Sequence, residues 1–99
     1  MILQKKIDQL IDILLEIKEH IKDESDCIWT YYETPEQIRD EINKYILELE
    51  NGNMQSLDEI NMHFLPTAAY QEHSMSNGWS DEYIKLAGEF DRIYNALKK

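Results

Sequence analysis

Residues 3–21 of this 99-residue chain read LQKKIDQLIDILLEIKEHI. Apolar residues recur in this stretch at alternating spacings of four and three. Because that spacing returns to the same side of an α-helix, it predicts one helix with a continuous apolar stripe. Ile11 and Ile13 widen the stripe, which favours a helix packed against more than one neighbour. The stripe itself consists of Leu3, Ile7, Leu10, Leu14, Ile17 and Ile21.

Start and stop signals predict three further helices. Residues 34–37 read TPEQ, in which the threonine caps, the proline suits the first turn and the glutamine completes a capping box. The Asn-Gly pair at 51–52 predicts the end of that helix. Residues 56–59, SLDE, form a second capping-box pattern, and Pro66 predicts the end of the short helix that follows. The sequence SDE at 80–82 predicts the start of the last helix.

These patterns together predict an all-α protein, a single domain over residues 1–99 with a four-helix bundle-like architecture. Residues 66–79 lack a long apolar period, so we expect an irregular or short-helix segment before the last helix, with residues 67–75 as the helix and residues 77–78 as its end. The expected apolar faces are Ile38, Ile42, Tyr45, Ile46 and Leu49, then Leu57, Ile60, Phe64 and Leu65, and finally Tyr83, Ala87, Phe90, Tyr94 and Leu97, with Ile84, Leu86 and Ile93 beside them.

Acidic residues dominate the middle of the chain. Residues 23–59 carry eleven acids and two bases, a net charge of −9, whereas residues 1–22 are neutral and residues 60–99 carry −1. An ordinary solvated helix face is one interpretation. It leaves the imbalance of sign unexplained, because like charges at helical spacing destabilise one another. The other interpretation is a surface for a basic partner. The acids expected opposite the apolar stripe of the second helix are Glu36, Asp40, Glu41, Glu48 and Glu50.

Composition excludes several classes of protein. A sequence pI near 4.6 argues against binding nucleic acid or an anionic membrane, since both require Lys/Arg clusters. Cys27 is the only cysteine, which favours a reducing compartment. Lys5, Lys6 and Asp8 stand where a signal peptide needs its apolar run, and no apolar stretch is long enough to span a bilayer. We therefore expect a cytoplasmic protein.

The residues that could perform chemistry form no recognisable site. His20, His63 and His73 are too far apart for a local metal signature, so we expect surface or boundary histidines, no metal and no cofactor. Asp23, Glu24 and Asp26 closely precede Cys27, and we expect such acids to raise the pKa of the thiol, which disfavours a nucleophile. No enzyme activity is expected, although a site built from His63, His73 and nearby carboxylates remains an alternative. The methionines at 54, 62 and 75 are interpreted as core gap-fillers.

Residues 64–79 read FLPTAAYQEHSMSNGW. This stretch resembles small bacterial immunity proteins of polymorphic-toxin and contact-dependent inhibition systems, in which a Leu-Pro-Thr turn, a Gln-Glu/Asp-x-Ser run and an Asn-Gly-Trp precede the last helix. The resemblance covers about residues 60–95. It implies a cytoplasmic protein that binds and blocks a cognate toxin domain, often a nuclease. The acidic middle of the chain agrees independently, because nuclease sites are basic.

The sequence therefore predicts an immunity protein that contacts a basic toxin domain through an acidic surface, with adjacent tyrosines as anchors. Trp79 is interpreted instead as a plug at the end of the bundle. The rival hypothesis is a homo-oligomeric helical adaptor or regulatory protein, a homodimer in which the stripe of residues 3–21 pairs with a second copy. The predicted partner-binding residues are Asp23, Glu24, Asp26, Tyr31, Tyr32, Glu33, Glu36, Asp40 and Glu41.

Overall fold

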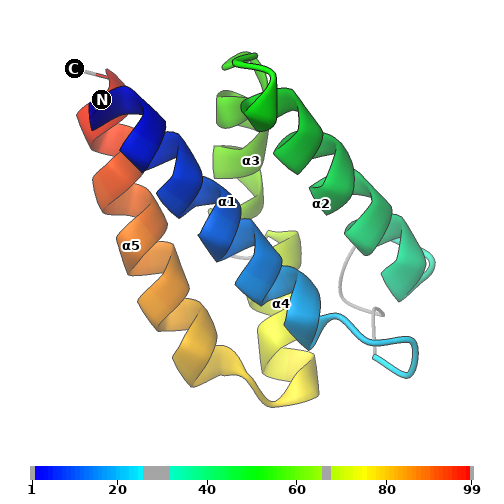
Figure 1. Cartoon of the computed structure of the whole chain (residues 1–99). Helices are drawn as coiled ribbons and strands as arrows, with labels where there is room; N and C mark the ends of the chain where they lie inside the picture. The colour runs from blue at the N-terminus through cyan, green and yellow to red at the C-terminus, as the bar shows by residue number, and fades with distance from the viewer. Residues whose placement is uncertain (1, 26–31, 66–67, 99) are drawn as a thin grey trace.

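The described part of the protein is built from α-helices (Figure 1). The computed structural model describes residues 2–25, 32–65 and 68–98. No strand occurs in those three ranges, which confirms the predicted all-α class. The helices are α1 (Ile2–His20), α2 (Pro35–Glu50), α3 (Ser56–His63), α4 (Ala69–Asn77) and α5 (Ser80–Lys98).

The helices form four rods that alternate in direction. Figure 1 shows α1 between α2 and α5, and the chain runs along α1 in the direction opposite to both neighbours. The short helices α3 and α4 follow one another from the end of α2 back to the start of α5, and so make the third rod. This arrangement confirms the bundle-like prediction with a short helix before the last one.

The core forms around the α1 stripe, as predicted. Ile17 is fully buried, and Leu10 and Leu14 are 1% exposed. The predicted face of α5 is partly wrong, because Ile84 is 68% exposed. This helix packs against both α1 and α4, so its buried face is centred between them. Leu65 is also exposed, against expectation. The buried residues of α5 are Tyr83, Leu86, Phe90 and Ile93.

Local hydrogen bonds define the helix ends. The Thr34 side chain accepts the N–H of Gln37, and the Gln37 side chain accepts the N–H of Glu33, so the predicted start of α2 is confirmed. At the ends of α2 and α4, Gly52 and Gly78 adopt φ values of 78° and 79°. Only glycine reaches this left-handed region without a steric penalty, which explains why both helices stop there.

The second predicted capping box is wrong. The N-cap of α3 is Gln55, and Ser56 is already a buried helical residue. The Asn53 side-chain carbonyl accepts the N–H of Gln55 at 3.0 Å. This local turn leads the chain into the helix one residue earlier than a serine cap does.

Two adjacent leucines test the orientation of α1. Leu14 is 1% exposed and Leu15 is 42% exposed. We expect Leu14→Ala to lower the free energy of unfolding by about 2–5 kcal/mol, because it leaves a cavity in the core. Leu15→Ala should cost less than about 1 kcal/mol. Urea denaturation of both variants measures the difference, and equal losses would show that α1 does not bury the face described here.

Candidate functional site

Most of the predicted partner-binding residues lie on the surface near the start of α2. Asp26 and Tyr31 lie outside the described residues. Tyr32 and Glu41 are half-buried. The exposed members of the predicted set are Asp23, Glu24, Glu33, Glu36 and Asp40.

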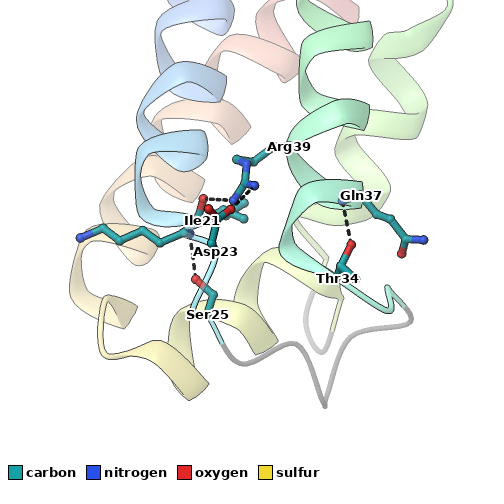
Figure 2. A network of polar contacts seen from close by, with 7 residues as sticks. Ile21, Asp23, Ser25, Thr34, Gln37 and Arg39 are labelled. Atoms are coloured by element: carbon teal, nitrogen blue, oxygen red, sulfur yellow. Dashed lines mark hydrogen bonds and ion pairs between the residues drawn. The ribbon is translucent and has the colours of Figure 1, made fainter.

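Arg39 joins the end of α1 to α2 (Figure 2). Its Nη2 donates to Asp23 Oδ1 at 2.5 Å, and its Nη1 donates to the carbonyl of Ile21 at 2.9 Å. The Asp23 side chain is 87% exposed, so the pair itself stabilises the fold by at most about 1 kcal/mol. The main effect of the ion pair is to hold Asp23 beside the first turns of α2.

The charge of this surface is left largely unbalanced. Within the described residues, Glu33, Glu36 and Asp40 form no ion pair with a lysine or arginine, although Lys44 follows Asp40 by one turn. Glu36 and Asp40 are four residues apart and therefore share one side of α2. We call the group Asp23, Glu33, Glu36 and Asp40 the acidic face.

The structure corrects the expected position of two other acids. Glu41 and Glu48 do not point straight to solvent opposite the apolar stripe. They follow the buried residues Ile38 and Tyr45 by three positions, which places them on the flank of the buried face. The Glu41 side chain is 32% exposed, and Glu48 is half-buried. The predicted acidic surface is therefore divided into an outer part and an inner part.

Glu41 belongs to a polar cluster between α2 and α3. The Tyr32 hydroxyl donates to Glu41 Oε1, and His63 Nε2 lies 2.9 Å from the same oxygen. The Tyr45 hydroxyl lies 3.0 Å from His63 Nε2 and donates to Glu59 Oε2 at 3.5 Å. Tyr32 also packs against the core, so it is engaged within the fold. Its role as a partner anchor stays a prediction.

A hollow opens over this cluster. It has a volume of about 210 Å³ and is lined by Glu41, Tyr45, Glu59, Met62 and His63. Tyr45 and His63 are 2% and 6% exposed, whereas Met62 is 63% exposed. Met62 therefore does not fill a gap in the core as expected, and neither does Met75, which is 62% exposed.

His63 is neutral in this setting at pH 7. Burial lowers its pKa below the usual 6.5, and the carboxylates of Glu41 and Glu59 oppose this shift without cancelling it. Because a carboxylate only accepts hydrogen bonds, the ring donates from Nε2 to Glu41. The Tyr70 ring packs against His63 from α4, with the ring centres 5.2 Å apart.

A second buried histidine lies further along the third rod, on α4. His73 is 1% exposed, and its Nδ1 accepts the indole N–H of Trp79 at 3.0 Å. The His20 ring stacks on Trp79, with the ring centres 4.5 Å apart. Trp79 is 4% exposed, which confirms its interpretation as a plug.

The expectation of surface or boundary histidines is wrong for His63 and His73. Spacing contained the missing signal, because each follows a buried residue of its own helix, Ile60 or Tyr70, by three positions. Histidine counts as a polar residue in such a pattern, so the pattern did not place either ring in the core. Each ring has a hydrogen-bonding partner in the fold, Tyr45 and Glu41 for His63 and the indole of Trp79 for His73.

Among the described residues, no group of three or more His, Cys, Asp or Glu side chains is placed to hold a metal ion. None of the helices described here carries an apolar stretch of the length that a bilayer requires. Comparisons of this chain with family models, with curated proteins and with solved structures found no match.

The buried His63 makes a prediction about pH. Its lowered pKa means that the unfolded chain takes up the proton first, so its contribution to stability is lost as pH falls from about 6.5 through the folded pKa. We expect the loss of unfolding free energy between pH 7 and pH 5 to be smaller in His63→Gln than in the unmodified protein. Each unit of pKa shift corresponds to about 1.4 kcal/mol of that difference.

Urea denaturation at both pH values measures the loss in the two proteins. The comparison is needed because acid also relieves repulsion among the carboxylates, and this relief is common to both. An NMR titration of the His63 ring checks the cause directly. A midpoint at or above 6.5 would contradict the assignment.

Proposed function

We propose that this protein is an immunity protein that binds a cognate basic toxin domain, in the most concrete form a nuclease, and blocks it through the acidic face. One observation carries the proposal. Glu33, Glu36 and Asp40 are exposed together at the start of α2, and no lysine or arginine of the described residues forms an ion pair with them. A chain with a net charge of −10 gains no stability from this clustering.

Such a surface raises the rate and the specificity of association with the proposed partner. Clustered charge of one sign steers an oppositely charged protein and raises the association rate, by an amount that falls with salt. The Debye length is about 8 Å at physiological ionic strength, so these acids act together only because they lie within a few turns of chain. The same surface repels nucleic acid, which leaves a basic protein as the matching class of partner.

The resemblance in residues 64–79 supports the class of function and not the location of the contact. Tyr70, Ser74 and Trp79 from this stretch are all buried. They are parts of the core, and a partner cannot reach them directly. A cytoplasmic location, where a producing cell needs protection from its own toxin, belongs to the same proposal.

The adaptor hypothesis loses its proposed interface. From Ile7 to Ile21, the stripe that was expected to pair with a second copy is buried inside one chain, where α1 packs against α2 and α5. Light scattering provides the check on this rival: we expect a monomer, and a stable dimer through α1 requires the core to open.

The acidic face makes a prediction about partner binding. The partner should be a basic protein that is toxic when expressed alone, and co-expression of this chain should restore growth. We expect the Glu36→Lys/Asp40→Lys double variant to reduce the association rate by about tenfold at low salt, because it reverses the steering charge. Affinity capture from the source cells identifies the partner, and stopped-flow binding measures the rate.

A matched control carries the same change of charge elsewhere. Asp12→Lys/Asp91→Lys reverses two exposed acids on α1 and α5. It should leave the association rate within about twofold, because neither acid belongs to the acidic face. Equal effects of the two double variants, or no effect of either, would overturn the assignment of the contact to the acidic face.

A further inference from the structure

We propose that the hollow between α2 and α3 is a binding site for one arginine side chain of the protein partner. The inference rests on the proposed function for the identity of the partner, and names the chemistry by which that partner is held. Glu41 from α2 and Glu59 from α3 line the hollow from two sides, over the buried rings of Tyr45 and His63.

The lining matches a guanidinium group in three ways. Two carboxylates from different helices accept hydrogen bonds from its fork of N–H donors. The buried rings of Tyr45 and His63 line the hollow beneath the position of the planar group. Met62 at the rim is 63% exposed, and its thioether offers apolar contact for the aliphatic stem of an arginine.

The charge of the hollow supports the arginine site independently. Among the described residues, no lysine or arginine forms an ion pair with Glu41 or Glu59. Of the described residues that line the hollow, His63 is the one basic side chain, and burial lowers its pKa, so it is neutral at pH 7. Glu41 is half-buried and therefore partly shielded from the water that would otherwise stabilise its charge. A cation that enters the hollow meets two carboxylates that accept hydrogen bonds within the fold but that no lysine or arginine of the described residues neutralises.

The size of the hollow decides between a side chain and a larger ligand. Its volume of about 210 Å³ is below the range of about 300–1,000 Å³ that is typical of cofactor and drug sites. A larger hollow of about 340 Å³ lies near the end of α1, but its lining carries both signs of charge, with Lys22 and His20 beside Glu24 and Glu82. That hollow therefore selects no class of ion.

The arginine site can be tested on the isolated full chain. N-acetyl-arginine methylamide is titrated into ¹⁵N-labelled protein, and amide shifts report where it binds. We expect saturable shifts at Glu41, Tyr45, Glu59 and His63 with a dissociation constant of about 1–10 mM, as for a single side-chain contact. The citrulline analogue has the same shape without the charge, and should bind at least about tenfold more weakly.

Two matched variants separate the hollow from general acidity. Glu59→Gln removes a charge at the rim of the hollow, where Glu59 is exposed and its bond to Tyr45 is long, so the fold is retained. It should weaken binding of the arginine analogue by about fivefold or more. Glu36→Gln removes the same charge from the acidic face and should change the affinity by less than twofold. Equal weakening by both variants, or shifts confined to the acidic face, would overturn the site.

The same variants distinguish this inference from the proposed function. With the partner bound, Glu59→Gln should raise the dissociation rate by about tenfold, whereas reversal of charge on the acidic face lowers the association rate. If the arginine analogue does not bind in the hollow, the site is wrong, and the acidic face can still bind a basic toxin. If the analogue binds and no basic partner is captured, the proposed function fails and the site stands.

Discussion

Burial of the α1 stripe is the constraint on which the other elements depend. From Ile7 to Ile21, its residues are almost fully removed from water, and α1 packs against both α2 and α5. Each buried Ile or Leu stabilises the folded state by roughly 1.5–3 kcal/mol, which is more than a typical hydrogen bond between neutral groups contributes. The position of α2 follows from that burial. With Ile38 and Ile42 directed at the core, Glu36 and Asp40 must lie on the outside.

The third rod shows how polar side chains are placed inside a small core. A chain of ring contacts links α3, α4 and α5: Phe64 stacks on Phe90 at 4.3 Å and meets Tyr70 edge-on at 5.2 Å. The rings of His63 and His73 extend this cluster at its two ends. A buried indole N–H needs an acceptor, and His73 supplies one to Trp79. Histidine fits here where leucine would leave Trp79 unsatisfied.

Helical periodicity predicted the helices of this fold, because each helix buries one face. The apolar residues of that face recur every three or four positions in the sequence. The α1 stripe, the start of α2 at Thr34 and the left-handed stop at Gly78 were all predictable from local pattern. The rotation of α5, which exposes Ile84, was not, because it depends on two neighbours at once. The meeting of Glu41 with His63 and Tyr32 joins segments distant in sequence, and no local spacing records it.

The division of the acids into an exposed face and a half-buried pair has a physical consequence for recognition. Exposed charges act over roughly the Debye length, so they govern the rate at which an oppositely charged molecule associates. Charges at the edge of a core contact a partner only once water has been displaced from between them. Each hydrogen bond there is stronger, and its loss costs more free energy. Glu36 and Glu41 lie five residues apart on α2, yet Glu36 is exposed and Glu41 is half-buried at the edge of the core. Substitutions at the two positions therefore change different rate constants, and a single measurement of affinity would merge effects that kinetics separates.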